Sequence, residues 1–267
     1  MRVLWEVHFC VPQKFLSLTE NNQFRISQLR EAAERWRIFK KEIVKIRTSF
    51  FLIFLMFSIS NYSQIKNFKE IEKYVKEVPE SETADIETLS KYLKKGAKTK
   101  KEIVARIYFW IAENIEYDWD AFNNKRQIDV SATATLENRK SVCSGYARLF
   151  KAICDNAQIK CVIIEGYAKG YGYKGERLTE TNHDWNAVKL YDKWELIDST
   201  WGIGGLILNG ENVKSWCARY LFEEPNDFIL EHFPKNEEWQ LLENKITIDT
   251  FFSEEMEKKR KIRKGEL

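Results

Sequence analysis

Apolar residues recur three or four positions apart in several segments of the chain, and this spacing predicts amphipathic helices. Four segments show it, at residues 65–78, 86–93, 99–114 and 141–157. Thr99 can cap the third helix, because Glu102 follows three positions later as in a capping box. Gly96 stands just after the second segment, where a helix-terminating glycine is expected. The region from residue 65 to 157 is therefore predicted to be mainly helical.

Shorter apolar runs follow and predict β-strands, at residues 161–167, 184–190 and 193–198. The last two runs are separated by Tyr191 and Asp192, which are expected to form a two-residue hairpin loop. In such a hairpin, the numbers of directly paired residues add up to 383. This register decides which side chains of the two strands share a face of the sheet.

A mostly apolar run spans residues 49–59. It is shorter than the roughly 20 residues that cross a membrane, but it has the length of a signal-peptide core. Basic residues precede it, namely Lys40, Lys41, Lys45 and Arg47. Because a signal peptide begins near the first residue, we expect translation to start near Val44 and the protein to be exported or membrane-anchored, outside the cytoplasm. A short signal anchor and a buried core helix are the alternatives.

Composition narrows the classes of function. The 267 residues include 43 basic and 40 acidic ones, and the net charge of +3 lacks the basic excess of a nucleic-acid binder. The five cysteines form no CxxC pair and the chain has three histidines, so we expect neither a metal site nor a cofactor. Cys154 and Cys161 could pair in an exported protein or remain buried free thiols.

Cys143 is the first candidate for chemistry. It lies in the first turn of the helix predicted to begin near Ser141. Unpaired backbone N–H groups and the positive end of the helix dipole lower the pKa of a thiol there and make it more reactive. Its own N–H is a natural oxyanion donor, and the small neighbour Gly145 would let a substrate carbonyl approach. The alternative is a small apolar residue at a helix start.

His183 and Asp198 are the second candidate. In the predicted hairpin, His183 faces Thr200 and Trp185 faces Asp198. His183 and Asp198 are then diagonal neighbours on one face, with Cβ atoms roughly 5–8 Å apart. At that distance a carboxylate can orient an imidazole that takes a proton from a thiol.

Several motifs resemble the transglutaminase-like superfamily, in which Cys, His and Asp occur in this order. They are the segments 141–147, 165–170, 182–188 and 194–202, with 115–118 before them, and with 232–234 and 239–242 resembling the kyphoscoliosis-peptidase branch. The resemblance implies an α+β fold of the papain/transglutaminase type, with the nucleophile helix packed on an antiparallel sheet. It also implies a triad of Cys143, His183 and Asp198, and all three residues are present.

For the remaining candidate residues, roles at the substrate site and roles in packing are both considered. Tyr117 and Trp119 are predicted to line the substrate site, where one of them could add an oxyanion donor, or else to be packing aromatics. Trp185 and Trp201 flank the triad and could shield the thiolate from water, but core packing is the preferred interpretation. His232 lies in a mostly apolar segment, before Pro234, and is interpreted as structural.

The chain is expected to divide into four parts. Residues 1–64 form an N-terminal extension, residues 65–98 a helical lead-in, residues 99–242 the transglutaminase-like core, and residues 243–267 a charged tail that is a solvated helix end or disordered. The core is predicted to act on a protein or peptide substrate through a thioester, as a peptidase, deamidase or cross-linker. The alternatives are a non-catalytic binding or scaffold module and an acyltransferase with a small-molecule donor. The oligomeric state stays open.

Overall fold

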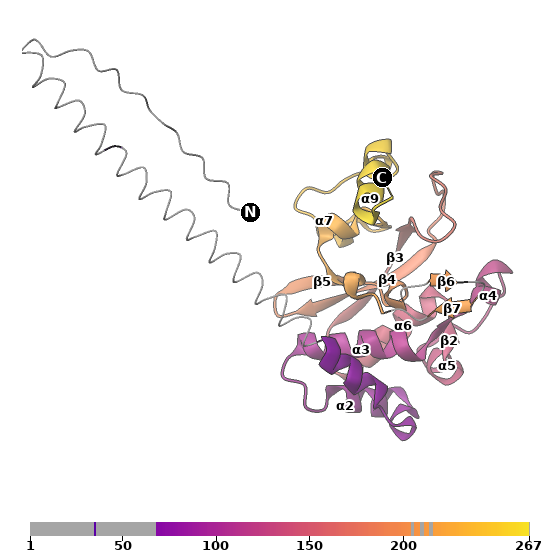
Figure 1. Cartoon of the computed structure of the whole chain (residues 1–267), viewed down its shortest axis with the longest axis vertical. Coiled ribbons are helices and arrows are strands. Elements are labelled where there is room, and N and C mark those ends of the chain that lie inside the picture. The colour runs from indigo at the N-terminus through magenta and orange to yellow at the C-terminus, as the bar shows by residue number, and fades with distance from the viewer. Residues whose placement is uncertain (1–34, 36–67, 204–205, 209–210, 214–215, 267) are drawn as a thin grey trace, which may run out of the picture. The chain divides into compact units, whose positions relative to one another are not determined.

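The computed structural model describes residue 35 and residues 68–266, apart from 204–205, 209–210 and 214–215 (Figure 1). The apolar run at 49–59 and Cys10 lie outside the described residues. Residues 66–267 form one compact unit. Within the part of the chain that is described, none of the helices combines the length and the apolar character needed to span a bilayer.

The helices predicted before the strands are present. Residues 68–76 are helical, and the following elements are η1 Glu80–Thr83, α2 Ile86–Lys94, α3 Lys100–Asn114, α5 Ala132–Asn138 and α6 Cys143–Asn156. The Thr99 side chain accepts a hydrogen bond from the Glu102 N–H, which caps α3 as predicted. Gly96 follows α2 with a φ of 71°, a left-handed conformation that glycine adopts without strain.

A five-stranded antiparallel sheet has the order β8-β5-β4-β3-β9. Its strands are β3 Cys161–Ala168, β4 His183–Leu190, β5 Lys193–Ile197, β8 Leu221–Glu223 and β9 His232–Pro234. The β4–β5 hairpin has the predicted register, with Asn186 opposite Ile197 and Leu190 opposite Lys193. Tyr191 has a φ of 55°, as the first residue of a tight two-residue hairpin turn requires.

Helix α6 is central because it packs against helices on one side and against the sheet on the other. Tyr146, Phe150 and Ile153 are buried in one cluster with Val188 and Ile197 of the sheet. These positions are the predicted apolar face of the helix. The α+β arrangement of a nucleophile helix on an antiparallel sheet is therefore confirmed. Cys154 and Cys161 are both buried and are free thiols.

The remaining elements connect these layers. Two short strands, β1 Glu116–Tyr117 and β2 Lys140–Ser141, pair in parallel just before α6. The others are α4 Trp119–Asn123, η2 Trp201–Ile203, β6 Leu206–Leu208, β7 Glu211–Val213, η3 Ala218–Tyr220, α7 Pro225–Phe228, η4 Glu237–Gln240 and α8 Ile248–Phe251.

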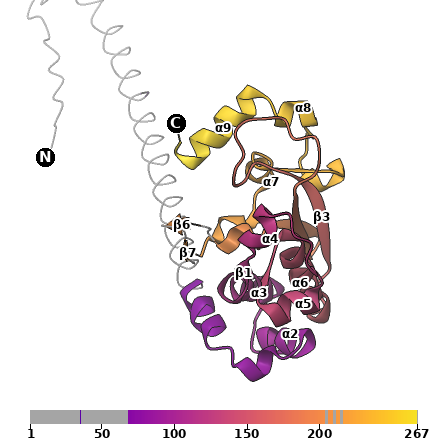
Figure 2. The same cartoon turned by 90° about the vertical axis from the view of Figure 1, so that its right-hand side faces the viewer.

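The charged C-terminal segment differs from the expected solvated or disordered tail. It contains α9, Glu254–Lys264, which buries Met256 and Arg260. Figure 1 and Figure 2 show α7 and α9 on one side of the sheet and α2, α3 and α6 on the other. Two further basic residues of α9 form ion pairs, Arg263 with Glu223 and Lys264 with Glu231. The helix is ordered because its charges have buried partners, which the local sequence does not reveal.

Candidate active site

Cys143 is the first residue of α6. The preceding residue, Val142, makes no capping hydrogen bond through its side chain. The backbone N–H groups of the first turn are therefore not occupied by a side-chain cap. Residue Cys143 is half-buried, and its thiol hydrogen-bonds to the His183 side chain and to the backbone N–H of Asp184. A basic side chain thus touches the sulfur, as activation of a nucleophilic thiol requires.

His183 links the thiol to a carboxylate. It begins β4, and Asp198 comes directly after β5, so the hairpin brings the two residues together. His183 Nε2 lies 2.7 Å from Asp198 Oδ2, which leaves Nδ1 for Cys143. The other oxygen of Asp198 accepts the backbone N–H groups of Thr200 at 2.9 Å and Trp201 at 3.0 Å. The structure therefore brings the three predicted triad residues into contact in the predicted order.

The electrostatics of these groups favour an ion pair. Burial lowers the pKa of His183, but the charge and hydrogen bond of Asp198 outweigh burial and raise that pKa to about 10. Burial alone would raise the pKa of Asp198, yet the two imidazoles beside it hold that pKa well below its usual range. Burial also opposes ionisation of Cys143, but the hydrogen bond and charge of His183 lower its pKa overall. Each group thus shifts the other toward the charged form, as in a thiolate–imidazolium pair.

His232 is a neighbour of the triad that the sequence analysis did not place there. It begins β9 and is fully buried. Its Nε2 lies 2.9 Å from Asp198 Oδ2, the same oxygen that contacts His183. Nothing in the local pattern indicates this contact, because 34 residues separate the two positions. The scarcity of histidine was the one signal available.

The cluster of His183, Asp198 and His232 also has the residue types of a metal site. One ligand atom of each lies within 4.8 Å of the others, and this is the one such group in the part of the chain that the structure describes. Both imidazole Nε2 atoms already lie at hydrogen-bond distance from one oxygen. Two N–H···O hydrogen bonds therefore account for the close approach of the three side chains.

A further hydrogen bond joins the segment that carries Cys143 to the segment that carries His183. The Ser144 hydroxyl donates to Asp184 Oδ2 at 2.5 Å. These residues directly follow Cys143 and His183, so the bond joins the start of α6 to the start of β4. It restricts how far the thiol and the imidazole can move apart.

Aromatic side chains lie beside the thiol. Tyr117 pairs in register with Ser141, two positions before Cys143. Burial first, and then the nearby Cys143 charge, raise the pKa of Tyr117, so its hydroxyl stays protonated. Its ring centroid lies 4.7 Å from that of Trp119, which in turn lies 4.9 Å from Tyr171 of the loop before β4. Tyr117 is therefore a neighbour of the thiol, and Trp119 packs on Tyr117; substrate contact by either residue stays a prediction.

The other predicted substrate-contacting residues are Gly145, Trp185 and Trp201. Gly145 is buried, and an added Cβ would come within 1.9 Å of Ser141 Oγ in β2 and 2.5 Å of Thr135 Oγ1 in α5, so its role is close packing. Trp185 is fully buried, with its ring against Phe228 and His232. Trp201 is partly exposed, and its ring covers His232 at 4.2 Å. The first two are packing residues, and Trp201 shields the imidazoles from one side.

Comparison with known proteins places the site in a family. Residues 87–199 match the model of the transglutaminase-like superfamily. The chain carries a transglutaminase-like domain. Human Kyphoscoliosis peptidase is 35% identical over 207 residues, which cover 76% of this chain and 31% of that protein. The mouse protein of the same name is 37% identical over 175 residues, covering 64% of this chain and 26% of its own. The branch indicated by the sequence motifs is thereby confirmed.

The chain spans about a third or less of the length of these curated relatives. A solved structure described as a TGase is 17% identical to this chain, covers 58% of it and 40% of its own chain, and has a TM-score of 0.35. The family assignment therefore rests on the sequence matches, and what the complete relatives do is carried over only as a proposal.

Proposed function

We propose that this transglutaminase-like domain is a cysteine-nucleophile enzyme that cleaves peptide or glutamine amide bonds through a thioester. The observation that supports this most directly is the continuous contact from Cys143 through His183 to Asp198. A scaffold that only binds has no need for a buried carboxylate and imidazole aligned on a thiol.

In the proposed reaction, the Cys143 sulfur attacks the amide carbonyl as a thiolate. The backbone N–H of Cys143, at the start of α6, is the donor that we propose for the oxyanion that forms. The His183 imidazolium then gives its proton from Nδ1 to the leaving nitrogen, and the amine departs. The acyl group remains on sulfur as a thioester, and Asp198 holds the imidazole in place throughout.

The acceptor of the acyl group decides the type of product. Water gives hydrolysis, and a lysine amine gives a cross-link. We propose hydrolysis, because the matched relatives with the higher identities carry the name peptidase.

One experiment separates these outcomes. The full chain and its Cys143→Ala variant are incubated with a denatured protein mixture and a fluorescent primary amine. Mass spectrometry then scores new peptide termini, glutamine deamidation and amine incorporation. New termini that require Cys143 support the peptidase. Amine incorporation without new termini would replace hydrolysis by cross-linking. If none of the three products depends on Cys143, and the thiol alkylates no faster than in denatured protein, the domain is a binding or scaffold module.

A further inference from the structure

The Asp198 carboxylate is shared by two histidines. Its Oδ2 atom lies 2.7 Å from His183 Nε2 and 2.9 Å from His232 Nε2. A triad needs one imidazole on its carboxylate, so the second requires its own explanation. The histidines come from β4 and β9, which lie on either side of β3, and the carboxylate follows β5. Side chains from β4, from β9 and from the residue after β5 therefore meet at this oxygen, and β3 holds β4 and β9 on either side of it.

The protonation of His232 follows from its surroundings. Asp198 is ionised, so an imidazole nitrogen at 2.9 Å from its oxygen must carry a hydrogen and donate it. The other ring nitrogen, Nδ1, is buried and has no partner among the described residues. A second proton there would place an unpaired positive N–H in the protein interior. His232 is therefore a neutral donor through Nε2.

The ring of His232 has little freedom to turn. Phe228 stacks on it with centroids 4.1 Å apart and planes at 20°. Trp201 lies 4.2 Å away on a tilted plane. The backbone is fixed as well, since His232 pairs with Ala168 of β3. The donor is consequently held in one direction, toward Asp198.

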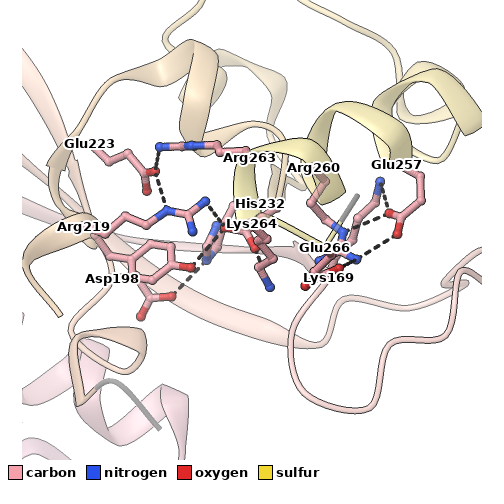
Figure 3. A network of polar contacts seen from close by, with 12 residues as sticks. Lys169, Asp198, Arg219, Glu223, His232, Glu257, Arg260, Arg263, Lys264 and Glu266 are labelled. Atoms are coloured by element: carbon pink, nitrogen blue, oxygen red, sulfur yellow. Dashed lines mark hydrogen bonds and ion pairs between the residues drawn. The ribbon is translucent and has the colours of Figure 1, made fainter. Parts of the chain in front are cut away.

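Charged contacts of Glu231, the residue before His232, hold the start of β9 in place. The adjacent Glu231 is 1% exposed and accepts hydrogen bonds from Arg219 at 3.1 Å and from the Tyr220 hydroxyl at 3.0 Å. Lys264 of α9 contacts its second oxygen at 2.9 Å. Figure 3 shows this network running from α9 past His232 to Asp198. The start of β9 is thus fixed between the sheet and the C-terminal helix.

We infer that His232 is a positioning residue that occupies one side of Asp198 Oδ2, so that the carboxylate can neither rotate nor accept His183 in a second orientation. With Oδ1 bonded to two backbone N–H groups, His232 completes the fixation of the carboxylate. His183 then has a single position, with Nε2 on Asp198 and Nδ1 on Cys143. This inference rests on the proposed function, because it assigns His232 to the same reaction.

The test compares three variants of the full chain. His232→Phe keeps a flat ring of similar size but no donor. His232→Gln keeps an N–H at a similar reach, and His232→Asn has an amide that is too short. The rate of Cys143 alkylation by iodoacetamide at pH 7 is measured together with the melting temperature. We expect the Phe and Asn variants to react about 10- to 100-fold more slowly, the range for losing one hydrogen bond to a charged group. The Gln variant should stay within about threefold of the wild type, the smaller loss expected when a donor is retained.

Proton NMR adds a signal that a purely structural role would not change. The chain has three histidines, so few downfield imidazole N–H resonances compete. Removing His232 should delete its own signal, and it should also broaden or shift that of His183 in the Phe variant but not in the Gln variant.

The outcomes are distinguishable. Wild-type alkylation no faster than in denatured protein would overturn the proposed function and this inference with it. An activated wild-type thiol with an equally reactive and stably folded His232→Phe variant would overturn the inference alone. If His232→Phe does not fold, equal rates for the Asn and Gln variants would overturn it instead.

Discussion

Replacing Asp198 by asparagine tests the electrostatic basis of the triad. The substitution keeps the size of the side chain and an oxygen for the backbone N–H groups of Thr200 and Trp201. It removes the charge and presents an N–H to His183. The imidazole must then accept at Nε2, so its proton moves to Nδ1, where it faces the thiol. In that tautomer His183 cannot take the proton of Cys143.

The size of the effect follows from two pKa values. Burial lowers the pKa of His183, yet Asp198 first and Cys143 second raise it from the ordinary 6.5 to about 10. Without Asp198, burial dominates and the ion pair is lost. Cys143 then ionises no more easily than an ordinary thiol with a pKa of 9.0, which is about 1% thiolate at pH 7. We expect alkylation at pH 7 to fall by up to about 100-fold.

The assay is the second-order rate of iodoacetamide alkylation of Cys143 between pH 5 and 11, followed by mass spectrometry. Cys143→Ser supplies the background from the other cysteines. The wild-type rate should already be high at pH 7, whereas the Asp198→Asn rate should rise with pH and approach the wild type above about pH 10. Equal rates at pH 7 would refute the role of Asp198. A deficit of constant size at every pH would indicate blocked access instead of lost activation.

Three further predictions follow from individual contacts. Asp184→Asn keeps an oxygen for the Ser144 hydroxyl but removes a charge that raises the pKa of Cys143, so the alkylation profile should move to lower pH; an unchanged or upward-shifted profile would contradict this. Gly145→Ala should lower the free energy of unfolding in urea by about 1–3 kcal/mol, because its Cβ would lie 1.9 Å from Ser141 Oγ, and a neutral result would show that the neighbouring side chains can move aside. Lys169 is fully buried, and burial lowers its pKa to about 8. The folded protein therefore binds fewer protons than the unfolded chain between about pH 8 and 10.5, so wild-type stability should gain up to about 3 kcal/mol across that range relative to Lys169→Met. Parallel pH–stability curves for the two proteins would disprove the Lys169 prediction.

The sequence predicted best those features that depend on residues close together in the chain. The β4–β5 hairpin has a two-residue turn and a strict alternation of side chains, so one register was available and it placed His183 beside Asp198. The start of α6 was similarly readable, because a helix with buried apolar residues on one face begins at Cys143. The fold and the triad contacts could be derived from these two elements and the order of the motifs.

What could not be predicted depends on contacts between distant segments. β9 has three residues, too few for a periodic pattern, and it pairs with β3 at the edge of the sheet. No local feature indicates that His232 would face Asp198. The order of the charged segment that forms α9 could not be predicted either. It depends on ion pairs with Glu223 and Glu231, and these two residues become buried only when the sheet has folded.

Gly166 lies between β4, whose His183 the sequence placed correctly, and β9, whose His232 it did not place. It lies in β3 directly between His183 of β4 and Pro234 of β9. An added Cβ would come within 2.3 Å of both the Phe233 carbonyl oxygen and the Trp185 ring. A larger residue would push β9 outward, and β9 carries His232. The glycine in the 165–170 motif therefore has a physical reason, which is to let β9 approach closely enough for the second imidazole to reach the carboxylate.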